Sequence, residues 1–235
     1  MNPLRRVTLG ISMLSAMVKL VRDPSRLDEV FTILDGIEQG PEADAFVAQF
    51  VSDTRNAEAF VLRPRVGKLE LETLLKLPEG TLGRTFAEEM RSRNLDPADI
   101  QMRERVVTDA EYIYQHLRET HDIWHTATGF EVDVAGELGL QAFYAAQFRA
   151  PLAVLIIAIG LLNSFFFSMD DAPQRLAAVT RGYSMGRAAR TFFGFDWAAH
   201  WSTPLAEVRA RLGVAEPASV ALTPHAADSG IRAAA

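Results

Sequence analysis

Apolar residues recur every three or four positions along most of this 235-residue chain, and this spacing limits the folds available to it. A clear example is the set Leu27, Val30, Phe31, Leu34 and Ile37, which follows Ser25 as an expected N-cap. Spacings of three and four place side chains on one face of an α-helix, whereas a half-buried strand requires strict alternation. Alternation is scarce in this sequence. The pattern therefore predicts an all-α protein.

Several further segments have helical spacing or helix boundary signals. Helices are expected at residues 45–60, 109–127, 134–148, 151–169, 174–193 and 204–212. Residues 69–77 lie between Pro and Gly residues, and they predict a short helix or, alternatively, a short strand. Residues 1–21 predict an amphipathic first helix that belongs to the fold. A cleaved signal peptide is the alternative, because two arginines precede an apolar stretch there.

Length and composition favour one domain and exclude several classes of function. We expect a single-domain helical bundle at residues 1–215, followed by a flexible tail at 216–235 that is rich in Pro, Ala, Ser and Gly. The chain has no cysteine, which excludes thiolate zinc sites and disulfides. Its net charge of −6 argues against nucleic-acid binding, which requires clustered Lys and Arg.

Two histidines and several acids are concentrated in "RETHDIWHTATGFEVDVAGE", residues 118–137. Thr108 and Glu111 form a capping box at the start of the preceding helix, and Gly129 is expected to end it. His121 and His125 are four residues apart, so they lie on one face of this helix, with Asp122 on the same side. Two imidazoles and a carboxylate so placed can bind one metal ion, and Glu137 on the next helix offers a fourth ligand.

The surroundings of these four residues distinguish a metal site from a chance surface cluster. Gly136 and Gly139 flank Glu137, and we expect them to let the two helices approach closely. Gln141 and Tyr144 follow one and two turns after Glu137, and Arg118 precedes His121 on its helix. Such a continuous polar patch between apolar helices favours a site. The residue after His121 is Asp rather than Glu, which argues against an HExxH metalloprotease. An HD-type phosphohydrolase is also disfavoured, since no histidine precedes His116.

HDxxH followed by eleven residues and Glu resembles the signature of the coenzyme Q (ubiquinone) biosynthesis family whose eukaryotic member is the fourth COQ protein. Four more blocks of the chain are similar to that family and occur in its order. They are "LVRDPSRLDEVF" (20–31), "LPEGTLGRTF" (77–86), "GELGLQAFYAAQ" (136–147) and "PLAEVRARLGV" (204–214). The chain departs from the family at Leu117, at Tyr144, where an acid is usual, and at residues 148–150. These departures bear on whether the substrate is the same.

The resemblance implies an all-helical protein that holds a divalent metal, usually zinc, at the positions of His121, Asp122, His125 and Glu137. Iron is not excluded by this set of ligands. The implied role is oxidative removal of the ring carboxylate from a polyprenylated 4-hydroxybenzoate-type precursor, with a hydroxyl in its place. A non-catalytic lipid-binding scaffold with a structural metal is the alternative, and a generic metallohydrolase is a third reading.

The same resemblance implies partners, a location and residues that contact substrate. The expected partners are the prenylated precursor, a membrane surface and other quinone-biosynthesis proteins, with a homodimer as one option. The location would be peripheral, on the cytoplasmic face of a bacterial inner membrane or the matrix face of the mitochondrial one. Arg84, Arg118, Gln141 and Tyr144 are the candidate substrate-binding residues.

Residues 150–169 form the most apolar stretch, in which only Asn163, Ser164 and Ser168 are polar. Its length approaches the roughly 20 residues that a transmembrane helix requires. However, Pro151 opens it, Gly160 interrupts it, and no basic cluster flanks it. We expect a core helix that lines a pocket for an isoprenoid tail. A membrane-dipping surface and a true span are the alternatives.

Overall fold

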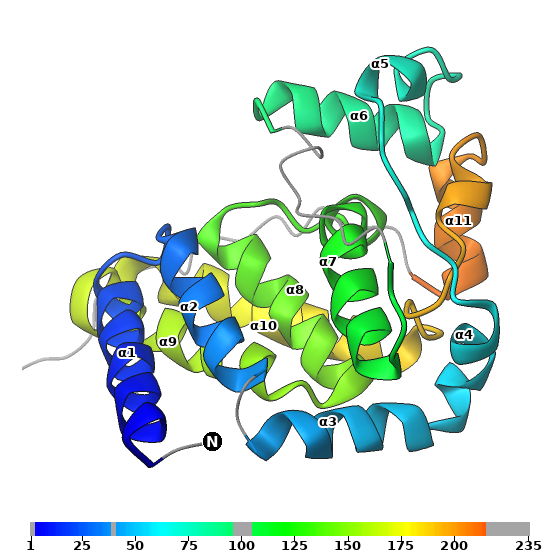
Figure 1. The fold of residues 1–235 in the computed structure, drawn as a ribbon. Helices are drawn as coiled ribbons and strands as arrows, with labels where there is room; N and C mark the ends of the chain where they lie inside the picture. The colour runs from blue at the N-terminus through cyan, green and yellow to red at the C-terminus, as the bar shows by residue number, and fades with distance from the viewer. Residues whose placement is uncertain (1–2, 39–40, 96–104, 215–235) are drawn as a thin grey trace, which may run out of the picture.

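The computed structural model describes residues 3–38, 41–95 and 105–214, and in these residues all helices and turns build one α-helical body (Figure 1). The helices are α1 (Pro3–Arg22), α2 (Leu27–Glu38), α3 (Pro41–Ser52), η1 (Thr54–Asn56), α4 (Ala57–Leu62), α5 (Leu71–Leu74), α6 (Leu82–Ser92), α7 (Asp109–Thr128), α8 (Val134–Phe148), α9 (Pro151–Phe167), η3 (Met169–Asp171), α10 (Ala172–Ala188), η4 (Ala198–His200) and α11 (Leu205–Leu212). The all-α prediction is confirmed. The expected tail at 216–235 lies outside the described residues.

Helix α8 occupies the centre of the body, and α10 packs along it (Figure 1). Most of its side chains are buried, among them Leu140, Phe143 and Phe148. A helix that is apolar on all sides belongs in a core. Glycines of α10 allow the close packing: a Cβ at Gly182 would overlap the carbonyl oxygen of Gly139. The position of α8 is therefore fixed by backbone contact as well as by side chains.

The main hydrophobic core lies where α3, α6, α7 and α11 meet α8. Its centre is aromatic: the Trp124 indole stacks on the Tyr144 ring at 4.5 Å between centroids, and Phe143 lies 4.6 Å from Phe192. Burying one such side chain stabilises the fold by roughly 1.5–3 kcal/mol. Because Trp124 belongs to α7 and Tyr144 to α8, this stack also holds together the two helices that carry the predicted metal ligands.

A second, smaller core joins α1, α2 and α9. Ala16, Leu20, Ile33 and Ile159 form it. The predicted amphipathic first helix is therefore part of the fold. Helix α9 is only half buried, contrary to the expectation of a core helix: Leu162 is exposed, as are the three phenylalanines Phe165, Phe166 and Phe167. Within the described residues, no helix is both long and apolar enough to cross a membrane.

Two predicted element boundaries differ from the structure, and one alternative left open by the sequence is decided. The helix expected at 45–60 is broken by Asp53, whose carboxylate accepts a hydrogen bond from the Arg55 amide at 3.0 Å and starts η1. Short polar side chains favour such turns over a continuous helix. Within residues 69–77, Leu71–Leu74 form the short helix α5, so the helical prediction holds and the strand alternative does not. Helix α10 ends at Ala188 instead of near 193, because the following chain turns toward Gln147, which accepts from the Phe192 amide at 3.2 Å.

Candidate metal centre

Helix α7 places its two histidines one turn apart on the side that faces α8. Its start is a complete capping box, in which Thr108 accepts from the Glu111 amide at 3.2 Å and Glu111 accepts from the Thr108 amide at 3.0 Å. Gly129 ends the helix in the left-handed conformation, with φ of 69°. Both boundaries agree with the sequence prediction, since both depend on local residues.

The first turn of α8 presents Glu137 to the same place. Asp133 caps this helix by accepting from the Gly136 amide at 2.7 Å. The two flanking glycines act differently from what the sequence suggested. A Cβ at Gly136 would overlap the Glu131 backbone, and a Cβ at Gly139 would overlap the Phe130 ring. Both glycines therefore make room for the loop between α7 and α8, and not for helix α7.

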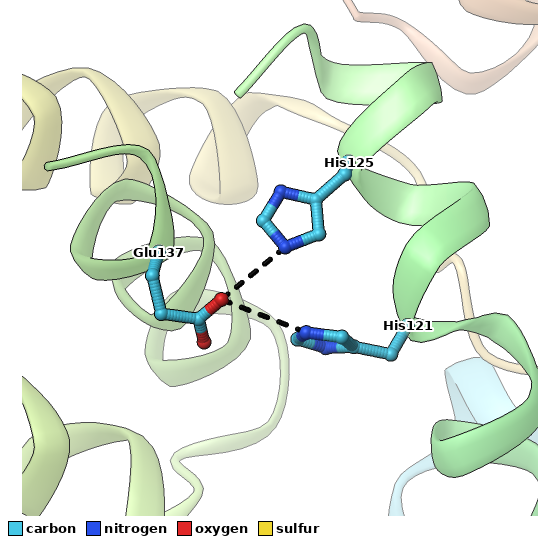
Figure 2. A group of neighbouring side chains, drawn as sticks. All are labelled: His121, His125 and Glu137. Atoms are coloured by element: carbon cyan, nitrogen blue, oxygen red, sulfur yellow. Dashed lines mark hydrogen bonds and ion pairs between the residues drawn. The ribbon is translucent and has the colours of Figure 1, made fainter. Parts of the chain in front are cut away.

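His121, His125 and Glu137 point toward one another across the gap between the two helices (Figure 2). Nε2 of His125 lies 3.2 Å from Oε2 of Glu137, and Nε2 of His121 lies 3.6 Å from the same oxygen. The His125 side chain is buried, with 2% exposed, whereas His121 and Glu137 are about one third exposed. The cluster therefore has a closed side and a side open to solvent.

The other nitrogen of each imidazole has its own partner. Nδ1 of His125 lies 3.0 Å from the carbonyl oxygen of Phe130, which requires an Nδ1–H donor, and Nδ1 of His121 lies 3.4 Å from the Tyr144 hydroxyl. A proton on Nδ1 leaves the Nε2 lone pair free for a metal, and such outer partners are usual for metal-binding histidines. On the other side, Gln141 donates to Oε1 of Glu137 at 2.6 Å.

Charge coupling within the cluster is strong. Burial lowers the pKa of His121, but the Glu137 carboxylate outweighs it and raises this pKa to about 9. For Glu137, burial raises the pKa, and the two imidazoles outweigh it and hold the pKa well below its usual range. Burial and the nearby carboxylates raise the pKa of the Tyr144 hydroxyl, so that it stays neutral. The site thus holds one carboxylate charge that a cation can share.

The arrangement fits a divalent metal. Ligand atoms bound tetrahedrally at about 2.0–2.2 Å from one ion lie about 3.4 Å apart, close to the two distances from Oε2 of Glu137. Imidazole and carboxylate are ligands for zinc and for iron. All three ligand atoms lie within 4.8 Å of one another, so the two imidazoles would have to approach each other somewhat to hold such an ion.

The remaining predicted residues have separate positions. Asp122 is half-buried on α7, and its charge helps to raise the pKa of His121. It does not belong to the three residues whose ligand atoms converge. The guanidinium of Arg84, on α6, binds Glu88 and the carbonyl oxygen of Leu75, outside the cluster. Arg118 is half-buried on α7, on the turn before His121. Gln141 and Tyr144 contact the cluster directly, so the structure brings together five of the predicted residues.

The structure adds one participant that the sequence did not indicate, the carbonyl oxygen of Phe130. A backbone acceptor has no sequence signature, although the Phe130 side chain shows that this loop is anchored. Its ring is buried, and the Arg181 guanidinium lies 3.9 Å above it. The anchored ring keeps the carbonyl oxygen directed at His125.

An all-helical body with two histidines and a glutamate between adjacent helices defines a class of helical proteins with a candidate metal centre. Comparison with known proteins narrows this class. The family model described as "Coenzyme Q (ubiquinone) biosynthesis protein Coq4" matches residues 1–218. The chain belongs to this family.

Individual relatives agree with the family model. The mitochondrial ubiquinone biosynthesis protein coq-4 of Caenorhabditis elegans is 28% identical over 90% of this chain and 91% of its own length. The mitochondrial COQ4 homologue of Rattus norvegicus is 30% identical over 72% of this chain, which spans only 64% of that relative. A crystal structure of a protein from Nostoc punctiforme matches with a TM-score of 0.75 and 30% identity, covering 87% of this chain and 98% of that one. The all-α fold is thus shared with an experimental structure.

Proposed function

We propose that this protein acts in ubiquinone biosynthesis on the ring of a polyprenylated 4-hydroxybenzoate-type precursor, where it replaces the ring carboxylate with a hydroxyl group. The carboxylate leaves as CO2, and the hydroxyl oxygen comes from dioxygen, with an external two-electron reductant taking the second oxygen atom to water. The observation that carries the proposal is a site with convergent ligand atoms from three residues, of which one is buried and two are partly exposed. Structural zinc sites are closed by four protein ligands, whereas catalytic sites keep a position open for water or substrate. Two histidines with one carboxylate are also the ligand set of non-haem iron oxygenases.

Each residue of the cluster has a separate proposed role at this site. His125 would hold the ion from the buried side, and Glu137 and His121 would complete the set at the solvent edge. When bound, the ion supplies Lewis-acid stabilisation of negative charge on a carboxylate or phenolate. Zinc exchanges no electrons, so oxidative chemistry favours iron at this site. The neutral Tyr144 hydroxyl lies beside His121, where it offers a hydrogen bond to a substrate oxygen.

Substrate handling and location follow from the chemistry of a prenylated ring. An isoprenoid tail belongs in a bilayer or in an apolar pocket, which favours a protein that works peripherally at a membrane. In a mitochondrion this would be the matrix face of the inner membrane, and in a bacterium the cytoplasmic face. Arg118, half-buried one turn before His121, is the proposed partner for a substrate anion.

A scaffold with a structural metal is the second candidate. It is favoured by the way His125 already joins α7 to the loop before α8. An ion bound there would strengthen this junction, and metal binding energy would then contribute to folding.

Glu137→Gln separates the two candidates, with Glu131→Gln as the control, since Glu131 is an exposed acid of the adjacent loop. Metal analysis of the purified wild type should find about one zinc or iron per chain, in accord with a single-ion site. For an enzyme, we expect Glu137→Gln to stay folded while cells that depend on it accumulate a prenylated ring that retains its carboxyl group. Normal quinone levels would overturn the catalytic proposal, and an unfolded variant would favour the scaffold.

A further inference from the structure

Helices α1 and α9 lie side by side at one end of the molecule (Figure 1). Both expose apolar side chains. Their mutual contact is well defined: Leu20 and Ile159 share the second core, and the Asn163 amide donates to the carbonyl oxygen of Val21 at 2.8 Å. Just over half of the large hydrophobic side chains that are exposed in the described residues belong to these two helices and to the adjoining Met169.

Helix α1 is apolar on two opposite faces. One face packs against α2 and α9 through Ala16 and Leu20. The other face consists of Val7, Ile11, Leu14 and Val18, whose exposed fractions are 61%, 65%, 62% and 46%. Spacings of four, three and four place these side chains in one row along about three turns of the helix. Nothing in the described part of the chain covers this row.

The last turn of α9 projects from the body. Phe165, Phe166 and Phe167 are 65%, 60% and 59% exposed. Consecutive helical residues point about 100° apart, so three neighbours are all exposed only where the helix end protrudes. Exposed phenylalanines are costly in water, and large exposed apolar patches mark sites of association with proteins or membranes.

Charge distinguishes a bilayer from a second copy of the chain. Helix α1 carries Arg5, Arg6, Lys19 and Arg22 and no acid, and α9 carries no charged residue. The whole chain has a net charge of −6, whereas the sequence of α1 is cationic. Pairing two copies of α1 would bring like charges together. Anionic lipid headgroups, in contrast, attract a cationic helix whose apolar face enters the acyl region.

We propose that the exposed faces of α1 and α9 form a docking surface for an anionic lipid bilayer, with the Val7–Val18 row and the Phe165–Phe167 turn inserted among the lipids. Two groups of acids border this surface. Glu29 of α2 pairs with Lys19 at 2.7 Å, so this cation of α1 already has an acidic partner. Asp170 and Asp171 follow α9, and Asp171 pairs with Arg175 at 3.1 Å. The inference deepens the proposed function, because it identifies the surface through which the protein would reach a membrane-bound substrate.

Vesicle flotation with substrate-free liposomes tests the surface independently of catalysis. The vesicles would contain phosphatidylcholine alone or a mixture with phosphatidylglycerol. Wild-type protein should float with the mixed vesicles and much less with the neutral ones, and added salt should weaken the binding. Ile11→Gln with Leu14→Gln, and Phe166→Gln with Phe167→Gln, should each lower partitioning at least about tenfold, since each pair removes two inserted apolar side chains.

Val61→Gln with Leu62→Gln is the matched control. These residues are 81% and 66% exposed on α4, and their loss should leave binding unchanged. Melting curves establish that each variant is folded, as expected for substitutions at exposed positions. The proposal would be overturned if wild type failed to float, or if the α1 and α9 variants floated as wild type does. Sedimentation showing a dimer that the α1 variant dissociates, with vesicle binding intact, would assign this surface to a second copy instead. Failure here leaves the metal experiment unaffected.

Discussion

Nδ1 of His125 lies 3.0 Å from the carbonyl oxygen of Phe130, while Nε2 of the same ring lies 3.2 Å from Glu137. One imidazole thus has a structural bond on one side and, on the other, the lone pair that we propose as a metal ligand. The two functions are separable, because an asparagine amide can occupy the Nδ1 position and a glutamine amide the Nε2 position.

We expect His125→Asn to retain the bond to Phe130 and to lose the metal. Its melting temperature in chelator should stay close to that of metal-free wild type. His125→Gln should instead lose the loop bond, at a cost of about 1 kcal/mol, the usual contribution of one hydrogen bond. Metal content by mass spectrometry and melting in chelator measure the two effects. Full metal occupancy in His125→Asn would contradict the assigned ligand set.

Tyr144→Phe tests the second outer partner of the cluster. The variant removes the hydroxyl that lies 3.4 Å from Nδ1 of His121 and keeps the ring that stacks on Trp124. Loss of an outer-shell partner lowers metal affinity about 10–100-fold, and the length of this contact favours the lower figure. Competition with a chelator measures the affinity, and Tyr183→Phe, at an exposed tyrosine of α10, is the control. Equal affinities of the Tyr144 variant and wild type would exclude a positioning role.

The sequence predicted where the two histidines and Glu137 lie relative to each other, because the signals for their two helices are local. Thr108, Glu111 and Gly129 bound α7, and Asp133 caps α8, so the positions of His121, His125 and Glu137 follow from residues within one or two turns. A spacing rule then places both histidines on one face. Recognition of the family rested on the same contiguous motifs.

Features that depend on distant contacts could not be predicted in this way. The carbonyl oxygen of Phe130 carries no sequence signal, and its direction depends on a ring held under Arg181. The apolar content of α9 does not indicate which of its faces is buried. That depends on how α1 and α8 pack against it. The break at Asp53 is a competition between a local turn and a continuing helix, which periodicity does not resolve.

His116 predicts a pH dependence of stability. The ring is buried, Nδ1 lies 3.2 Å from the Pro64 carbonyl oxygen, and Nε2 accepts from the Gly194 amide at 3.0 Å. Burial lowers its pKa from the ordinary histidine value of 6.5 to about 4. Between these values the unfolded chain binds a proton that the folded protein does not, so stability should fall as the pH drops from 6.5 to 4. The loss from this residue amounts to about 3 kcal/mol.

His116→Gln should remove this contribution. The variant would be less stable at pH 7, since one or both hydrogen bonds weaken, but its stability should decline less steeply between pH 6.5 and 4. Urea unfolding at several pH values in that window measures the slope. His200→Gln, at a half-buried histidine outside the core, should keep the wild-type slope. Parallel profiles for His116→Gln and wild type would show that another group causes the acid sensitivity.

Two glycine-to-alanine substitutions of equal size should change stability in opposite directions. Gly10 lies on the exposed side of α1, where an added Cβ meets nothing within 4 Å. Alanine is favoured over glycine inside a helix by roughly 0.5–1 kcal/mol, so Gly10→Ala should stabilise the protein by about that amount.

Gly182→Ala gains the same helix propensity, but its Cβ would overlap the carbonyl oxygen of Gly139 in α8. A backbone atom has no alternative rotamer, so the two helices must separate, and overpacking of this kind costs about 1–3 kcal/mol or more. Thermal unfolding measures both variants, with a shift of about 2–4 °C for each kcal/mol in a chain of this size. Because Gly139 lies two residues from Glu137, the separation should also lower metal affinity in Gly182→Ala and leave it unchanged in Gly10→Ala. Stabilisation by both substitutions would mean that α8 and α10 pack less closely than this structure shows.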